Sequence, residues 1–530
     1  MGRRDFLRMA GAYSGTVAAG AAGVGKLARR RTPDEHARSS RPSRAGVRTV
    51  TLPSGVTIPV ADWVVQENKR PGTLNWVVGA TTMMYAYSDR VSATRGQKVT
   101  LFVDAPQPTF RVELYRTGYY GGLGGRLVWK SGELAGQTQP ASTLTPGTNM
   151  VECDWKPSLR VTIKPDWPPG YYLFKLYGDA TGSISGWVPL IVRDDTSTAA
   201  VAIMSAVTTA QAYNTWGGYS LYVGPGAADT RSRVVSFDRP YDYKAWGAPN
   251  FSGNEFPLVF QAESVGLDVS YLTDIDLHAQ PGLLINHKCL FSLGHDEYWS
   301  QTMRTAADDA ITAGVNIAFL GANAIYRHIR LESSPLGPNR HQVCYKTDLM
   351  QEDPEWGVNQ AEVTADWPTG PDPRPEQAII GSQYVDVGAQ AGMTIVNPGH
   401  WVLKGTGLTM NQTLPGVILG EYDRYEPGDP GPTNVELVAH SAITNRGPNS
   451  FSDVTYYTRA GGGGVLATGS ASYVSFLSDA PKIYPNFIQP AVPVVTPAFA
   501  RMMENVFSVF GAGPASKTHP SVPNWQSFYR

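Results

Sequence analysis

Four apolar runs of strand length constrain the fold of this chain more than any other sequence feature. They open the segments AAVAIMSAV (199–207), GLDVSYLTDIDL (266–277), KCLFSLGHDEYWS (288–300) and VNIAFLGANAIY (315–326). A strand that is buried on both faces is apolar throughout, whereas a strand with one solvent-exposed face alternates between apolar and polar residues. Between two of these runs, SQTMRTAADDAITAG has helical composition, with Ser300 as candidate N-cap and Gly314 as candidate C-cap. Strands that alternate with helices predict an α/β domain with a mostly parallel sheet.

The preceding part of the chain, from about residue 50 to residue 195, has a different pattern of apolar and turn-forming residues. Segments such as QKVTLFVDAP, FRVELYRTG and GYYLFKLYG are short and separated by Gly and Pro. This pattern is typical of strands joined by turns, and the simplest architecture is an immunoglobulin-like β-sandwich. We therefore expect an α+β multidomain chain. Its parts are a signal and basic linker (1–47), the β-sandwich (48–195), an α/β catalytic domain (196–510) and a C-terminal tail (511–530).

Composition narrows the class of protein. The chain has 530 residues, of which 42% are hydrophobic, which is enough for several globular domains. A net charge of −1 gives no reason to expect a nucleic-acid partner. The chain has three widely spaced cysteines, Cys153, Cys289 and Cys344. We expect three buried thiols, and at most one disulfide could form among them.

The N-terminus carries a candidate export signal. Arg3 and Arg4 precede a weakly apolar Ala/Gly run from Met9 to Val24. This run is shorter than the roughly 20 apolar residues that a membrane-spanning helix needs. The pattern resembles a twin-arginine signal, which predicts the twin-arginine translocase as a partner and a periplasmic, secreted or cell-surface location. Residues 28–48 are rich in Arg, Pro and Ser and are expected to form a solvated linker.

Polar residues gather where the predicted strands end. Tyr213 follows the first run, His295 and Glu297 follow the third, and Asn323 follows the fourth. Ligands of open parallel sheets bind at the carboxyl ends of the strands, so these segments are expected to converge on one rim. In extended chain, residues two apart point the same way, so His295 and Glu297 can address one ligand. Glu421 is expected to join them from the later strand PGVILGEYD.

Several acidic residues near the same strand ends have a simpler interpretation. We interpret Asp274, Asp276 and Asp296 as helix caps or turn residues, because that is the usual role of a lone Asp after a strand.

Missing motifs exclude several chemistries. The chain has no Pro-Cys-x-x-Cys half of a zinc deaminase site, no His-Glu-x-x-His and no Gly-x-Ser-x-Gly elbow. The glycine run 461–464 lacks the Gly-Lys-Ser/Thr of a phosphate loop. Carboxylate oxygens suit hard cations, and tyrosine oxygen is known as an iron ligand. A metal site with oxygen ligands is therefore the remaining candidate.

The order of several segments resembles a known family. RTGYYGGLGGRLV, AYNTWGGYS, YLTDIDL, GHDEYWS and GANAIYR follow one another as in the large subunit of N,N-dimethylformamidase and its relatives, over roughly residues 62–469. The resemblance implies an immunoglobulin-like sandwich before a glutamine amidotransferase-like α/β domain. It also implies a hydrolase of linear amides with a mononuclear ferric iron held by two tyrosines and one glutamate.

The resemblance assigns these ligands to residues of this chain. It implies that Tyr213 and Glu297 bind the iron, together with Tyr172 from the strand GYYLFKLYG. Tyr171 is the alternative to Tyr172, and only one of them can reach the metal, because successive strand residues face opposite ways.

Four further roles are hypotheses about the chemistry of the predicted site. His295 is expected to act as acid or base or to orient Glu297, and Asn323 to stabilise the oxyanion. Glu421 is expected to pass a proton to the leaving amine, and Lys346 to help polarise the carbonyl. The implied substrate is a small amide. A separate small subunit is implied by the family, and a homo-oligomer is left open. Export is not expected of a cytoplasmic amidase of solvents, so dimethylformamide itself is not assumed.

Two other functions remain open at this point. One is an exported, non-catalytic protein that binds glycans or cell-wall polymer through tryptophans. The candidates are Trp155, Trp167, Trp187 and Trp216. The other is a glycoside hydrolase with a pair of carboxylates. Its candidates are Asp296, Glu297, Glu421 and Asp423. The carboxylate pair needs no metal, so metal content separates it from the amidohydrolase.

Overall fold

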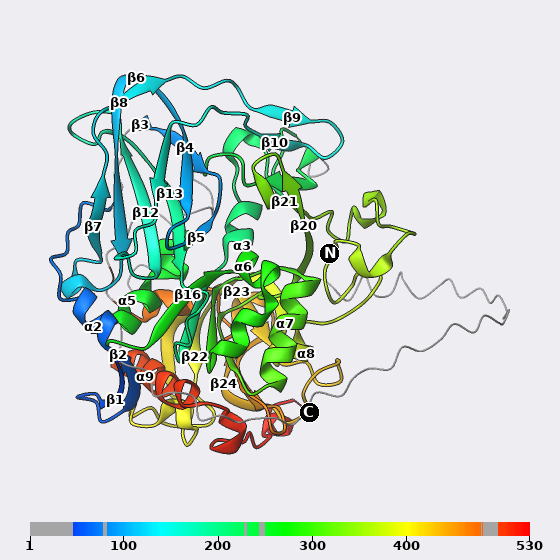
Figure 1. The fold of residues 1–530 in the computed structure, drawn as a ribbon. Helices are drawn as coiled ribbons and strands as arrows, with labels where there is room; N and C mark the ends of the chain where they lie inside the picture. The colour runs from blue at the N-terminus through cyan, green and yellow to red at the C-terminus, as the bar shows by residue number, and fades with distance from the viewer. Residues whose placement is uncertain are drawn as a thin grey trace, which may run out of the picture. The chain divides into compact units, whose positions relative to one another are not determined.

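The computed structural model describes residues 46–77, 82–226, 230–242, 250–478, 480 and 497–529. The predicted export signal and most of the predicted linker, residues 1–45, lie outside this range. The described chain is a mixed α/β structure with several sheets and few helices (Figure 1). In these ranges no helix is both long enough and apolar enough to cross a bilayer. The chain from Gly46 onward forms one compact unit.

The β-rich part is organised around one strand of 20 residues, β6 (Lys98–Thr117). Its first half pairs with β4 (Tyr85–Ser88) and β11 (Leu159–Thr162), and its second half with β7 (Gly125–Lys130) and β12 (Gly170–Tyr177). β12 also pairs with β13 (Ile184–Arg193). Apolar side chains from both halves share one buried cluster, which includes Val99, Val112 and Phe174. The two halves of β6 therefore contribute to one buried core in this β-rich part.

Shorter elements complete this part of the chain. They are β1 (Val47–Thr51), β2 (Thr57–Ala61), α2 (Asp62–Glu67), β3 (Thr82–Met83), β5 (Ser92–Thr94), β8 (Leu134–Gln137), β9 (Thr143–Thr145) and β10 (Met150–Glu152).

The four apolar runs form neighbouring strands of a seven-stranded sheet. The strand order is β16 (Val269–Thr273), β14 (Val201–Ser205), β17 (Cys289–Gly294), β19 (Asn316–Gly321), β26 (Gly464–Ala467), β25 (Phe451–Thr458) and β24 (Glu436–Ala442). The first five strands are parallel to one another, β25 pairs antiparallel with β26, and β24 pairs antiparallel with β25. Every residue of β14, β16, β17 and β19 is buried. The predicted mostly parallel sheet is therefore present.

Helices cover this sheet. They are α3 (Val207–Ala212), α4 (Asn250–Asn254), α5 (Phe256–Ser264), α6 (Asp274–Ala279), α7 (Gln301–Thr312), α8 (Gln377–Ile380) and α9 (Pro497–Ala512). Ser300 is the N-cap of α7 as predicted, since its hydroxyl accepts a hydrogen bond from the Met303 amide. The C-cap is Ala313, and Gly314 follows it with a left-handed φ of 100°. Glycine is favoured at that position because it has no Cβ.

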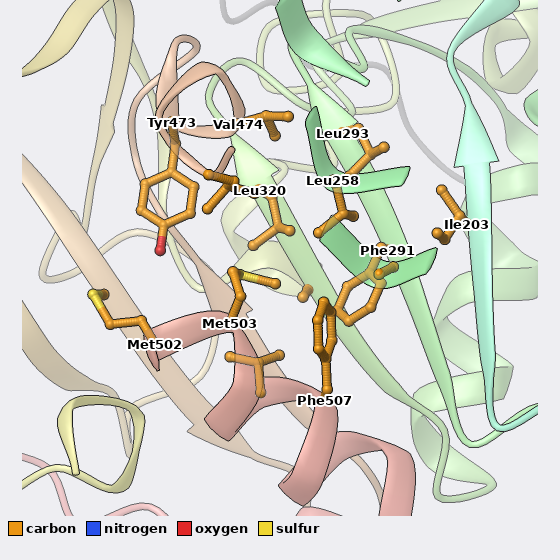
Figure 2. Close-up of a cluster of buried hydrophobic side chains, with 14 of the residues drawn as sticks. Ile203, Leu258, Phe291, Leu293, Leu320, Tyr473, Val474, Met502, Met503 and Phe507 are labelled. Atoms are coloured by element: carbon orange, nitrogen blue, oxygen red, sulfur yellow. The ribbon is translucent and has the colours of Figure 1, made fainter. Parts of the chain in front are cut away.

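Helix α9 supplies much of the apolar core beneath the sheet. Figure 2 shows Met503 and Phe507 pointing from α9 toward Leu320 and Phe291 on the strands. The rings of Phe291 and Phe507 lie 5.7 Å apart, edge to face. This packing joins residues that are about 200 positions apart in the chain, so the sheet and the C-terminal helix form one core.

Two predicted details are different in the structure. PGVILGEYD forms β23 (Thr413–Arg424), but β23 pairs antiparallel with β22 (Gln383–Thr394) and not within the parallel sheet. The predicted tail is packed against the domain, because α9 continues to Ala512 and the Tyr529 hydroxyl donates a 2.5 Å hydrogen bond to Asp453. All three cysteines are buried and free, as expected.

A smaller sheet lies beside the parallel one. It contains β15 (Val234–Ser236), β21 (Gly337–Val343), β20 (Arg327–Ser334) and β18 (Tyr298–Ser300). β18 and β20 begin directly after the ends of β17 and β19, so the chain between them passes along the rim of the parallel sheet.

A fully buried ion pair ties the β-rich part to the α/β part. Arg116 of β6 donates hydrogen bonds of 2.5 and 3.0 Å to the carboxylate of Glu263 in α5, and both side chains are inaccessible to solvent. Tyr120 and Tyr271 add hydrogen bonds to this pair. A buried charge without its partner is strongly unfavourable, so the pair fixes the position of β6 relative to α5.

The core packing leads to a stability prediction. Leu320 of β19 is fully buried, whereas Leu144 of β9 is 45% exposed. Leu320→Ala should lower the free energy of unfolding by about 2–5 kcal/mol, because it leaves a cavity in a packed core. Leu144→Ala should change it by less than about 0.5 kcal/mol. Denaturant unfolding of both variants makes the comparison, and equal losses would contradict this assignment of the core.

Candidate functional site

Two glycines shape the backbone at the rim of the sheet. Gly294 ends β17 and Gly321 ends β19, and the two residues are paired. A Cβ on Gly321 would lie 1.4 Å from the carbonyl oxygen of Gly294, so no larger residue fits there without a backbone shift. Gly294 has a left-handed φ of 66°. The chain turns away from the sheet at these glycines, and the next residues on each side are the candidate site residues.

The buried carboxylate of Glu297 is the centre of the site. The side chain is 1% exposed. Tyr213 donates to Oε2 at 2.8 Å, and Tyr222 donates to Oε1 at 2.8 Å and Oε2 at 2.9 Å. Arg327 Nε donates to Oε1 at 3.2 Å. The Glu297 backbone N–H donates to Thr209 Oγ1 in α3, which fixes the residue from behind. Two phenol oxygens and one carboxylate therefore meet at one point.

The two tyrosines are held together. Their rings stack with centroids 4.3 Å apart, and the Tyr298 hydroxyl donates to the Tyr222 hydroxyl at 2.7 Å. Burial and the nearby negative charge of Glu297 raise the pKa of both Tyr213 and Tyr222 well above the usual range. In the protein alone, both phenols are therefore protonated hydrogen-bond donors at neutral pH.

A cation lies behind Tyr222. The Lys346 ammonium is 3.2 Å from the centroid of the Tyr222 ring. Burial, assisted by the charge of Arg327, lowers the pKa of Lys346 to about 7. Arg327 also forms an ion pair with Asp366, so it bridges that carboxylate and Glu297. These cations offset the negative charge that the site concentrates.

A cavity of about 370 Å³ opens in front of the three oxygen groups. His295, Asn323 and Glu421 line it together with Tyr213 and others. Burial lowers the pKa of His295, so its imidazole is neutral near pH 7. Burial and the charge of Glu297 raise the pKa of Glu421 well above its usual range, so that carboxyl holds its proton.

Two polar atoms at this cavity have no hydrogen-bond partner among the described residues. They are Oδ1 of Asn323 and Oε2 of Glu421, and both are buried. Buried polar atoms in folded proteins nearly always have a partner, and an exception calls for an explanation. A polar ligand in the cavity would satisfy both atoms.

The backbone around the cavity is strained. Asn323, Ile325 and Lys346 have φ values of 58°, 54° and 62°. This region is uncommon for any residue with a Cβ and is unusual for a β-branched residue such as Ile325. The Ile325 N–H donates to the Asp296 carbonyl, and the Arg327 N–H donates to the Glu297 carbonyl. These bonds hold the strained turn after β19, and such strain clusters at functional sites.

The structure brings five predicted site residues together and separates two. Around the cavity lie Tyr213, His295, Glu297, Asn323 and Glu421. Lys346 does not line the cavity and instead contacts the Tyr222 ring from behind. The strand that carries Glu421 is not part of the parallel sheet, although this was predicted for it. Glu421 lies on the hairpin strand β23, and its carbonyl accepts from the Ala471 N–H after β26.

Tyr172 is not part of this cluster, and the predicted ligand set needs correction there. Its hydroxyl donates to the Pro168 carbonyl at 2.6 Å, and its ring belongs to the buried apolar cluster of the β-rich part. Tyr171 faces the other side of β12 and stacks on Phe251, also away from the 370 Å³ cavity. Tyr222 supplies the second tyrosine oxygen near Glu297.

The sequence contained only a weak signal for Tyr222. It lies nine residues after Tyr213, and the loop between them folds back because the Leu221 N–H donates to the Ala212 carbonyl. With 26 tyrosines in the chain, spacing alone does not select this one. Arg327 was also missed, although it directly follows the segment GANAIY.

The remaining acidic residues have structural partners. Asp276 forms a capping box with Thr273 at the start of α6, which confirms its interpretation as a cap. Asp274 accepts from Thr208, and Asp296 accepts from Ser292. Among the described residues that line the cavity, the carboxylates are therefore Glu297 and Glu421.

Most of the tryptophans considered for glycan binding pack in the interior. Trp155, Trp167 and Trp187 are 3–6% exposed, whereas Trp216 is only partly buried. The buried rings offer no surface on which a sugar could stack.

The fold and the cavity define an α/β protein with a ligand site at the carboxyl end of its parallel sheet, where such proteins bind ligands. The sequence profile of the family described as N,N-dimethylformamidase beta subunit-like, C-terminal, matches residues 111–486, which is more than half of the chain. The chain belongs to this family. Comparison with curated proteins gives no match. The matched range contains every residue that lines the cavity.

The glycine contact predicts a sharp difference between two substitutions. Gly321→Ala should lower the free energy of unfolding by about 1–3 kcal/mol, because its Cβ overlaps backbone. Gly132 is the matched control, since it is exposed, has an ordinary φ and leaves open space where a Cβ would lie. Gly132→Ala should be neutral or stabilising by up to about 1 kcal/mol. Chemical denaturation measures both, and tolerance of Gly321→Ala would refute the close approach.

Proposed function

We propose that this protein is an iron-dependent amidohydrolase that cleaves the C–N bond of a small amide. The observation that carries the proposal is the convergence of Tyr213, Tyr222 and Glu297 at one wall of a cavity. Membership of the dimethylformamidase-like family supports a hydrolase of this kind. With it we propose the finer fold assignment, an immunoglobulin-like sandwich followed by a glutamine amidotransferase-like domain.

The donor set fits a ferric ion. Tyr213, Tyr222 and Glu297 offer only oxygen atoms, which suit a hard cation, and tyrosine oxygen is an established ligand of iron. The two phenols now donate their protons to Glu297 in hydrogen bonds of 2.8 and 2.9 Å, so a cation among the three groups would take the place of those protons. A ferric ion held there would supply Lewis acidity to an amide carbonyl and to a water molecule.

The other residues of the cavity are placed for proton transfer and positioning. His295 is neutral and can accept a proton from the attacking water. Asn323 reaches the cavity from its strained turn, and its side-chain Nδ2–H can donate to the carbonyl oxygen of the amide as charge develops there. Glu421 keeps its proton and can give it to the amine that leaves. Lys346, behind Tyr222, favours the ionised form of that phenol.

Location and assembly are proposals on separate grounds. The N-terminal Arg3-Arg4 pattern supports export by the twin-arginine translocase and a periplasmic, secreted or cell-surface location. The family is described as beta subunit-like, which supports assembly with a second, small subunit. A homo-oligomer remains compatible with both.

Iron retention distinguishes the two tyrosines that sequence and structure favour. Tyr222→Phe and Glu297→Gln should each lose most of the iron and the visible tyrosinate-to-iron absorption, because each removes one of three oxygen ligands. Tyr172→Phe is the matched control and should keep both, since its hydroxyl bonds to the Pro168 carbonyl. Elemental analysis and the visible spectrum of the purified variants give the answer. Full iron and colour in Tyr222→Phe would remove that residue from the ligand set.

Catalysis provides a second test. Glu421→Gln keeps the shape of the side chain but has no proton to give as an acid, so kcat for amide hydrolysis should fall by roughly 10²–10⁴-fold with iron retained. Glu332→Gln, at a largely exposed position outside the cavity, should leave kcat unchanged. An unchanged kcat in Glu421→Gln rejects the proton-donor role. Hydrolysis of glycosides by iron-free protein would instead favour the carboxylate pair.

A further inference from the structure

The size of the cavity sets the first limit on the substrate. Its volume is about 370 Å³. A dry, apolar cavity of about 150 Å³ is enough to bind benzene, which has six non-hydrogen atoms. Dimethylformamide has one atom fewer, so it would leave most of this cavity unfilled. A ligand that fills the space must carry a substantial group in addition to its amide.

The lining of the cavity sets the second limit. Besides the polar residues, the cavity is lined by Tyr326, Tyr384, Val387 and Leu419. The rings of Tyr326 and Tyr384 contact each other with centroids 5.1 Å apart. Val387 is 51% exposed at the opening of the cavity. This aromatic and aliphatic wall, which we call the hairpin wall, would gain little from a ligand without apolar surface.

Three residues of the hairpin wall belong to the β22–β23 hairpin, namely Tyr384, Val387 and Leu419. Tyr326 comes from the segment just before β20 and packs against Tyr384. The pairing of the two strands shifts between Asp386 and Ala389, so Val387 falls in a bulge. A bulge re-aims a side chain, and bulges are common next to active sites. Asp386 forms an ion pair with Arg446, and the Asn445 amide donates to the Gly388 carbonyl at 2.7 Å. These contacts fix the bulge and keep Val387 at the cavity.

We propose that the substrate is an amide that bears an aromatic or similarly large apolar group, which binds against the hairpin wall while the amide faces Glu297 and Asn323. This inference rests on the proposed function. Hydrolysis of such an amide consumes one water, whose oxygen bonds to the acyl carbon while the C–N bond breaks and the amine nitrogen gains a proton. The hairpin wall then determines which amides the enzyme accepts.

The test compares the binding of two probes to the iron-loaded, full-length protein. Calorimetry measures the Kd of N-benzylformamide and of N,N-dimethylformamide, and turnover of both is recorded on the same samples. The aromatic amide should bind at least ~10-fold more tightly, since even one methylene in an apolar pocket is worth about that factor. Val387→Trp should abolish the difference by filling the cavity beside the wall.

The control and a second variant keep the outcome decisive. Val358→Trp, at a position that is 79% exposed and does not line the cavity, should retain the preference. Val387→Asp replaces apolar surface by charge without added bulk, so it should weaken the binding of the aromatic amide and leave that of dimethylformamide unchanged. This variant keeps the test valid if Val387→Trp does not fold. Equal Kd values for the two probes, or an unchanged preference in both Val387 variants, would overturn the inference. Binding decides this inference, whereas the absence of turnover for every amide would count against the proposed function.

Discussion

The site depends on one requirement, which is that a carboxylate buried as deeply as that of Glu297 must receive hydrogen bonds or a compensating charge. Its donors come from three separate segments, namely Tyr213 after α3, Tyr222 in the following loop and Arg327 at the start of β20. Satisfying the carboxylate therefore draws these segments to the same edge of the sheet. A single acidic residue organises the cavity wall in this way.

Basic side chains around that carboxylate compensate its negative charge. Arg327 bridges Glu297 and Asp366, and Lys346 lies against the Tyr222 ring. The strained turn after β19 is held by its own backbone N–H groups, which donate to the carbonyls of Asp296 and Glu297, so the position of Asn323 is coupled to the same centre. Because the electrostatics and the backbone constrain each other, the site is pre-organised, which is what charge development in a reaction requires.

The features that could be predicted from the sequence are those with a strong local pattern. The continuous apolar runs identified β14, β16, β17 and β19, and the rule on strand ends then placed His295, Glu297 and Asn323 at one rim. Tyr222 could not be selected, because a loop tyrosine has no periodicity and its position depends on how the loop folds back. The hairpin partner of β23 could not be predicted either, since a short apolar stretch looks alike in parallel and antiparallel pairing. Tyr172 was misplaced because the face of β12 on which it lies is set by tertiary packing.

The central claim is that Tyr213, Tyr222 and Glu297 form an iron centre, and the position of the metal tests it most directly. Crystals of the iron-loaded protein would be measured on both sides of the iron absorption edge, and the anomalous difference density compared. We expect one strong peak, present only above the edge, within bonding distance of both phenol oxygens and the Glu297 carboxylate. A peak that contacts Tyr172 instead, or no peak among these three groups in a sample that contains iron, would contradict the claim.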